Sequence, residues 1–147
     1  MNPIKLYRIS HYFYRKNIPI IPKFFEILLF VLCGCHIPAK TKIGKDTYLG
    51  HGGVGVVING KCIIGNKCII GNGVTLGGSM EGVPRVGDKV YISTGAKIIG
   101  NISIGNECMI GANAVVIKDV PDKCCVAGVP AKVIKENINI NDYTSMI

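Results

Sequence analysis

The sequence predicts an all-β solenoid that follows a short helical segment, and three features of its repeats carry this prediction. An aliphatic residue recurs at a step of six residues, glycine commonly follows it, and a second small or apolar residue lies four positions later. A step of six is neither the 3.6-residue period of a helix nor the alternation of an isolated strand. It is typical of short strands joined by tight turns, in which apolar side chains stack from coil to coil. At three hexads per coil, the repeats should form about four coils.

Both repeated positions keep their phase through three blocks of sequence, so we expect both sets of side chains to be buried. The first set is Ile43, Leu49, Ile58, Ile64, Ile70, Leu76, Val86, Ile92, Ile98, Ile104, Ile110 and Val116. The second set is Thr47, Cys62, Cys68, Val74, Val90, Ala96, Ile102, Cys108, Ala114 and Val120. The three cysteines of the second set should therefore act as small hydrophobes. The chain has seven cysteines, an odd number that disfavours a disulfide scaffold and favours a reducing cytoplasm.

The first 35 residues hold most of the aromatic side chains and no hexad, which marks them as a separate helical segment. Asn2 and Pro3 suit the N-cap and first position of a helix that reaches about Lys16. A second helix is expected from Pro22 to about Gly34. We therefore predict a helical segment over 1–35, a repeat domain over 36–136 and a tail over 137–147. The two helices should either cover one end of the solenoid, because a solenoid needs its terminal coils capped, or form an oligomer contact.

The formal charge of +8 indicates affinity for an anionic partner. The lysines are dispersed and do not alternate with aromatic residues after Tyr48, so we expect no nucleic-acid partner. A phosphate-bearing ligand such as coenzyme A and an acidic membrane surface explain the charge equally well. The apolar stretch 18–35 is interrupted by prolines and charges and is too short to span a bilayer. Peripheral contact of residues 1–35 with the inner face of the membrane is left open beside a cytoplasmic location.

The repeat slips out of phase at two places, and these places indicate function. The step from Leu49 to Ile58 is nine residues, and the three extra residues enter within the stretch 50–53, which contains His51. Imidazole suits the removal of a hydroxyl proton near neutral pH, which makes His51 the candidate general base. The step from Leu76 to Val86 is ten residues and extrudes a loop that begins at Gly77 and Gly78. The backbone amides of these two glycines are candidate donors to a developing oxyanion, although turn glycines need no such role.

Four stretches carry a resemblance to a known family: KIGKDTYLGHGGVGVVING (42–60), GVTLGG (73–78), GAKIIGNISIGNECMIGANAVV (95–116) and VAGVPAKVI (126–134). They resemble the hexapeptide-repeat acyltransferases of the serine acetyltransferase-like group, in particular its short members from surface-polysaccharide pathways. The resemblance implies a left-handed parallel β-helix, a homotrimer, acetyl-CoA as co-substrate and His51 as the catalytic histidine. It also implies coenzyme A contacts between neighbouring β-helices. Those contacts would come from Thr94, Ala112, Lys118, Lys132 and Lys135.

The sequence departs from serine acetyltransferases where those enzymes orient the histidine and bind serine. The position of the orienting carboxylate is His36, and the position of a serine-binding aspartate is Gly50. The arginine–histidine pair falls near Gly82, with Arg85 close by. We therefore expect a sugar hydroxyl as acceptor, with His36 and Arg85 as candidate substrate-binding residues. Serine is the alternative acceptor, and a non-catalytic structural β-helix is the alternative of another class. With three histidines in the chain, no metal site is expected.

Overall fold

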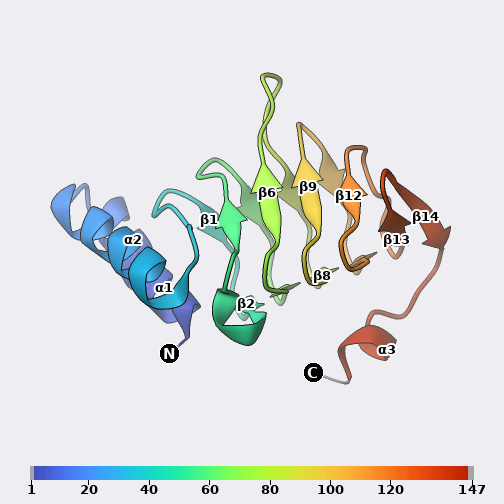
Figure 1. Ribbon diagram of the computed structural model, residues 1–147, viewed down its shortest axis with the longest axis horizontal. Coiled ribbons are helices and arrows are strands. Elements are labelled where there is room, and N and C mark those ends of the chain that lie inside the picture. Colours follow the sequence, from blue (N-terminus) through green and yellow to red (C-terminus); the bar gives the residue numbers. More distant parts are fainter. Residues whose placement is uncertain (1, 146–147) are drawn as a thin grey trace.

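The computed structural model describes residues 2–145, and its central part is a solenoid with three faces, in which strands of successive coils pair in parallel and only the last strand is antiparallel (Figure 1). The β1 face consists of β1 (Lys42–Ile43), β4 (Ile63–Ile64), β7 (Arg85–Val86) and β10 (Ser103–Ile104). The β2 face consists of β2 (Tyr48–Leu49), β5 (Ile69–Ile70), β8 (Tyr91–Ile92), β11 (Met109–Ile110), β13 (Cys125–Gly128) and β14 (Ala131–Lys135). The β3 face consists of β3 (Val57–Ile58), β6 (Thr75–Gly77), β9 (Lys97–Ile99) and β12 (Val115–Val116). The chain visits the faces in the order β1, β2, β3 in every coil.

The strand register gives the length of each coil and locates both phase slips. Val86 pairs with Ile104, and Ile98 pairs with Val116, a separation of 18 residues that equals three hexads. Leu49 pairs with Ile70 at a separation of 21, three more than 18. Ile70 pairs with Ile92 at a separation of 22, four more than 18. The extra residues leave the strand pairing intact, so they lie in the corners between faces.

The interior of the solenoid is filled by the two repeated sets of side chains, as predicted. All twelve residues of the first set are buried, and so are all ten of the second set. Cys62, Cys68 and Cys108 lie in this core as free thiols with no measurable or very little exposure. Burial raises the pKa of the Cys62 thiol to about 11. These thiols are therefore neutral packing groups rather than nucleophiles.

Side chains at the corner between the β1 and β2 faces bind the backbone of the preceding coil. The side-chain oxygen of Asn66 accepts from the amide of Lys45 at 2.8 Å, and that of Asp88 accepts from the amide of Asn66 at 2.7 Å. The Asn106 and Asp122 oxygens repeat the contact on the amides of the coils before them, at 2.8 Å and 2.7 Å. This ladder satisfies amides that the short strands leave free, so it fixes the coils at one corner.

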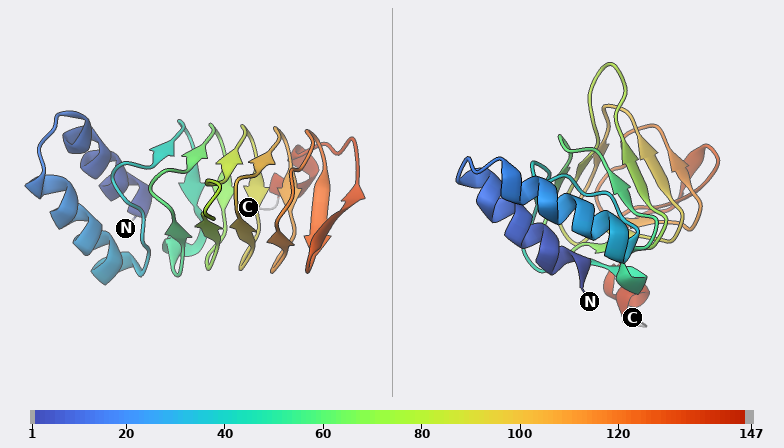
Figure 2. Two further views of the ribbon diagram at one scale, coloured as in Figure 1. Left: turned by 90° about the horizontal axis from the view of Figure 1, so that it is seen from above. Right: turned by 60° about the vertical axis from the view of Figure 1, so that its left-hand side comes forward.

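Two helices, α1 (Pro3–Arg15) and α2 (Ile20–Cys33), cover the first coil of the solenoid (Figure 2). As predicted, Asn2 caps α1, and its side chain accepts from the amide of Ile4 at 3.1 Å. α2 begins two residues before the predicted Pro22, because a proline in the first turn removes no helical hydrogen bond. It ends before Gly34, whose φ of +62° suits glycine. The buried Tyr7 hydroxyl donates to the Thr41 carbonyl, which ties α1 to the solenoid.

The C-terminal residues return along the outside of the β2 face. Ile138 and Ile140 are buried and cluster with Cys125, while Tyr91 and Met109 pack against them. The short helix α3 (Asn141–Thr144) follows (Figure 1). The segment expected as a tail is therefore packed as far as the described residues extend, and it shields this face from solvent.

Candidate active site

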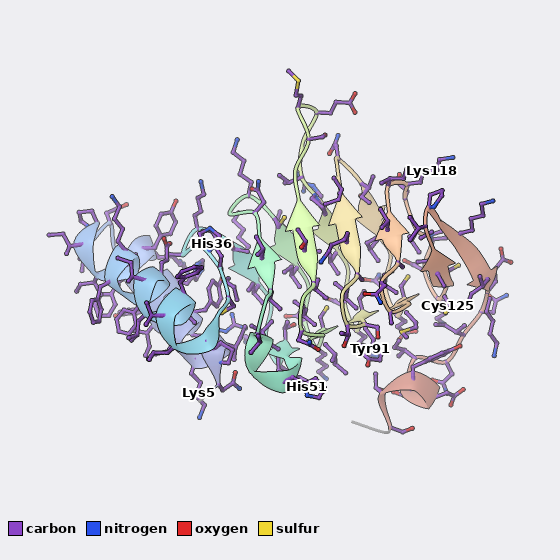
Figure 3. The ribbon with its side chains drawn as sticks, in the orientation of Figure 1. Lys5, His36, His51, Tyr91, Lys118 and Cys125 are labelled. Atoms are coloured by element: carbon purple, nitrogen blue, oxygen red, sulfur yellow. The ribbon has the colours of Figure 1, made fainter. Side chains whose placement is uncertain are left out.

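His51 lies at the corner between the β2 and β3 faces, in the turn η1 (Gly50–Gly53) that the first phase slip creates (Figure 3). Its φ of +49° is in the left-handed region, which is uncommon for a residue with a side chain. Gly52 and Gly53 also have positive φ, so the three extra residues form a tight bulge. The imidazole is exposed to solvent at the tip of this bulge. Because the flanking residues Gly50, Gly52 and Gly53 have no side chains, no other side chain of this turn covers the His51 imidazole.

Thr94 and Ala112 lie on the same corner as His51, in the turns that follow β8 and β11. Backbone hydrogen bonds connect successive turns there: the Gly73 amide donates to the Val54 carbonyl at 2.8 Å, and the Asn113 amide donates to the Thr94 carbonyl at 2.9 Å. The Thr94 hydroxyl also donates to the Asn72 side-chain oxygen at 3.0 Å. The structure thus aligns the predicted base and two predicted coenzyme A contacts along one edge of the solenoid.

A cation at this corner was missed by the sequence analysis. Lys97 lies on the outer side of β9, and its Nζ donates to the Gly73 carbonyl in the turn one coil before it. The hexad places Lys97 next to the interior residue Ile98, which predicts an outward side chain. It does not predict that the ammonium turns back to the corner, because that contact joins residues 24 positions apart.

Other predicted site residues lie at the opposite edge of the β3 face. Gly77 ends β6, and Gly78 begins the loop that the second phase slip extrudes. The loop and Lys40 line an open hollow of about 540 Å³. Lys118 is exposed in the turn after β12, and in Figure 3 it is far from His51. Arg85 is exposed on β7, which belongs to the β1 face. One chain therefore does not bring these residues to His51.

His36 lies beside β3, where its amide donates to the Val56 carbonyl at 2.8 Å and it forms a bridge with Val57. It lines a shallow hollow of about 400 Å³ together with Thr75 and Gly77. Figure 3 shows the side chains of His36 and His51 well apart. Within one chain, His36 does not orient the imidazole of His51, although it occupies the position where the carboxylate was expected. Of the three histidines, only His11 has a side-chain hydrogen bond within residues 2–145, between its Nδ1 and the Ala39 carbonyl.

The remaining predicted lysines lie at the C-terminal end of the solenoid. Lys132 and Lys135 are exposed on β14, which pairs antiparallel with β13. They lie beyond the coil of Ala112, on the β2 face and not at the corner that holds His51. Among the described residues, no group of three or more His, Cys, Asp or Glu side chains is placed to hold a metal ion.

Comparison with known proteins agrees with the geometry of the coils and corners. Residues 84–118 match the family described as bacterial transferase hexapeptide (six repeats). A serine acetyltransferase from Synechococcus elongatus is 39% identical over 132 residues, which cover 87% of this chain and 54% of that protein. The chain is a hexapeptide-repeat protein of the serine acetyltransferase-like group. It spans little more than half the length of that relative.

Solved structures of the serine acetyltransferase group superpose on most of the chain. A serine acetyltransferase in complex with CoA has a TM-score of 0.83 and 36% identity, covering 90% of this chain and 55% of that one. The Neisseria gonorrhoeae serine acetyltransferase in complex with serine has a TM-score of 0.85 and 35% identity, with 90% and 55% covered. The predicted fold class, a left-handed parallel β-helix with a short N-terminal helical segment, is confirmed.

Proposed function

We propose that this chain is an acetyl-CoA-dependent O-acetyltransferase in which His51 is the general base. The observation that carries the proposal is the exposed His51 at a phase slip, on the same corner as Thr94 and Ala112. The left-handed backbone does not by itself distinguish His51, because Lys67 and Lys89 share it at regular turns of the solenoid. What distinguishes His51 is its place in a three-residue insertion outside the hexad, where an interruption of a solenoid commonly carries the binding face. The name carried by the relatives and the CoA complex of a structural neighbour support the same activity.

In the proposed reaction, the imidazole of His51 accepts the acceptor's hydroxyl proton while the hydroxyl oxygen bonds to the thioester carbon of acetyl-CoA. The bond from that carbon to sulfur then breaks, and the imidazolium returns the proton to the departing thiolate. Proton transfer of this kind contributes about 10²–10⁴-fold to a rate. Amides of Gly77 and Gly78 are proposed donors to the carbonyl oxygen.

The proposed site needs residues from two chains. Gly77, Gly78 and Lys118 lie across the β3 face from His51, so a single chain separates the proposed base from the proposed oxyanion donors. In a ring of identical chains, the His51 corner of one chain meets a different edge of its neighbour. We propose a homotrimer in which coenzyme A lies between adjacent solenoids. Thr94 and Ala112 would then bind it from one side, and Lys118, Lys132 and Lys135 would meet its phosphates.

For the acceptor, the comparisons support L-serine more than the sugar that the sequence analysis favoured. The relatives carry the name serine acetyltransferase, and one structural neighbour contains serine. We therefore propose L-serine as the first acceptor to test. A sugar hydroxyl stays a second candidate for one reason: Gly50 and Gly82 offer no charge to a zwitterion at positions where the group has charged residues.

The proposed function is tested by measuring CoA release from acetyl-CoA with L-serine and, separately, with a panel of nucleotide sugars. The His51→Asn variant is the sharper substitution, because asparagine tolerates the left-handed backbone that alanine does not favour. We expect it to lower turnover by about 10²–10⁴-fold while coenzyme A binding and thermal stability stay unchanged. His11→Asn, which alters a histidine of the helical hairpin, is the matched control. Equal turnover of His51→Asn and the unaltered chain would contradict the proposal.

A further inference from the structure

The hairpin of α1 and α2 exposes a broad apolar stripe at the end of the molecule. Ile20, Phe24, Ile27 and Val31 are 59–78% exposed, and their spacing places them on one side of α2. Along α1 and at its C-cap, the residues Lys5, Ile9, Tyr12 and Lys16 have the same spacing and are also exposed. Tyr7 of α1 and Glu26 of α2 bind the first coil from the opposite sides of their helices, through the Thr41 carbonyl and the Ala39 amide. Because the hairpin lies at the end of the solenoid (Figure 2), we infer that the two stripes share the face turned away from it.

Of the exposed large hydrophobic side chains found in the described part of the chain, 10 of 17 belong to residues 9–32. Scattered surface hydrophobics are ordinary, but a contiguous patch of this kind marks an interaction surface. We name this surface, made of the two stripes, the end platform. Its apolar half lies on α2, and its basic half lies on α1.

The helical segment is strongly positive around this surface. Residues 1–35 contain Lys5, Arg8, Arg15, Lys16 and Lys23 against Glu26 alone, so five positive charges and one negative charge give +4, half of the chain's +8. The Glu26 carboxylate is turned inward, where it accepts from the Ala39 amide at 2.6 Å. The end platform therefore carries exposed lysines, and residues 2–35 have no exposed carboxylate to offset their charge.

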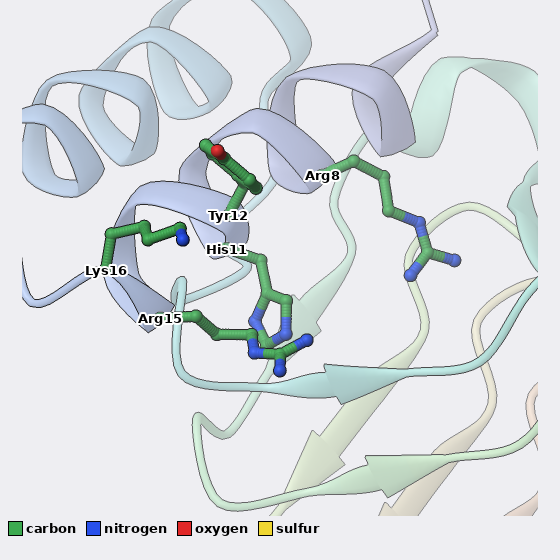
Figure 4. A pocket seen from close by; sticks show the side chains of 5 residues that line it. All are labelled: Arg8, His11, Tyr12, Arg15 and Lys16. Carbon is green, nitrogen blue, oxygen red and sulfur yellow. The ribbon is translucent and has the colours of Figure 1, made fainter.

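A basic pocket of about 360 Å³ adjoins the platform on the side of α1 (Figure 4). Its lining is Arg8, His11, Tyr12, Arg15 and Lys16, without an acidic side chain. The Arg8 guanidinium donates to the Ile43 and Gly44 carbonyls, which holds it in place beside the pocket. Tyr12 and Lys16 belong to both the pocket and the platform, so an anionic group in the pocket would lie at the rim of the apolar stripe.

We propose that the end platform docks on an anionic membrane surface, with the α2 stripe in the interfacial region and the basic pocket on a lipid phosphate. Anionic headgroups complement the +4 charge, whereas a second copy of this chain would set two segments of +4 against each other. No helix within residues 2–145 has the length and apolar character needed to cross a membrane. At 1.5 Å per residue, the 14 residues of α2 span about 21 Å, less than the bilayer core of about 30 Å. The helix therefore lies in the interface plane.

The test is sedimentation of the full chain with vesicles of phosphatidylcholine alone and with vesicles that contain about one third phosphatidylglycerol. We expect binding to the anionic vesicles and weakening of that binding by salt. The Lys5→Gln/Lys16→Gln variant should bind them about 25-fold more weakly, at roughly fivefold per lysine. Phe24→Gln/Val31→Gln should weaken binding by about tenfold or more, because it removes two inserted side chains.

Val133→Gln/Ile134→Gln changes two exposed apolar residues of β14 at the other end of the solenoid and should bind as the unaltered chain does. His51→Asn should also bind normally, which separates this proposal from the proposed acetyl transfer. Equal vesicle binding by Phe24→Gln/Val31→Gln and the unaltered chain would overturn the proposal. So would a change in the mass of the lipid-free particle on that substitution, because a second copy would then be the occupant.

Discussion

At the scale of single residues, the position of a residue in the hexad determines whether its side chain is packed in the core. Interior cysteines such as Cys62 and Cys68 take the place of aliphatic residues, and burial raises the pKa of both thiols. His51 lies outside the hexad, on a bulge with a left-handed backbone. The cysteines on the repeat are therefore inert packing groups, whereas the residue proposed as the general base, His51, lies in an interruption of the repeat.

The buried thiols predict a loss of stability at alkaline pH. The pKa of Cys62 is about 11 in the folded chain and about 9 as an ordinary thiol, so the unfolded chain releases this proton first. The stability is complete below pH 9, and it falls as the pH rises toward 11. In Cys62→Ala, the slope of unfolding free energy against pH in this window should be smaller by about 1.4 kcal/mol per pH unit, the contribution of one proton. Urea unfolding of both chains at several pH values measures this slope, and identical slopes would contradict the assignment.

At the scale of elements, strands of two or three residues are too short to hold the coils in place by their own pairing. The corners add the missing contacts. The ladder of Asn66, Asp88, Asn106 and Asp122 connects the coils at one corner, and backbone hydrogen bonds between turns connect them at the His51 corner. The hairpin of α1 and α2 closes the first coil, whose edge would otherwise pair with another chain.

The ladder predicts a measurable cost for removing one of its steps. The Asn106→Ala variant loses the oxygen that accepts from the Asp88 amide at 2.8 Å. We expect a destabilisation of about 1 kcal/mol, the net value of one such hydrogen bond. Glu81→Ala, in the extruded loop, is the control and should stay within about 0.5 kcal/mol. Chemical denaturation compares the two variants, and equal midpoints would show that the ladder contributes nothing.

At the scale of the whole molecule, the proposed acetyl-transfer site is distributed over two edges of the β3 face. His51, Thr94 and Ala112 occupy one edge, and Gly78 and Lys118 occupy the other. The proposed membrane platform lies on the outer side of the hairpin that covers the first coil. α1 begins beside the His51 turn, where Pro3 lies against Gly53. Docking on lipid would leave the corners of the later coils, with Thr94 and Ala112, free for coenzyme A.

The distribution predicts that two inactive chains restore activity when they assemble together. We expect His51→Asn to be inactive alone, and likewise a variant without residues 78–82, which loses the loop and the proposed oxyanion donor Gly78. After they are unfolded and refolded together in equal amounts, about a quarter of the sites should combine an intact His51 with an intact loop, because each site draws at random on two chains. Recovery of about a quarter of the unaltered activity is the expected result. No recovery despite mixed assembly would show that one chain supplies the whole site.

By itself, the sequence determined the local plan of this protein: which residues face inward, a coil of 18 residues, and the two places where the repeat is interrupted. Burial of Ile70 or Leu76 follows from a six-residue period, and a period is a property of neighbours in the chain. The helix caps at Asn2 and Gly34 are local in the same sense. The tertiary structure decided which distant residues meet. Closure of the coils placed His51, Thr94 and Ala112 on one corner, turned Lys97 toward it, and paired His36 with Val57, away from the His51 side chain. It also packed Ile138 and Ile140 on the β2 face and left the α2 stripe exposed. These contacts join segments tens of residues apart, and only the stacking of whole coils fixes which segments become neighbours.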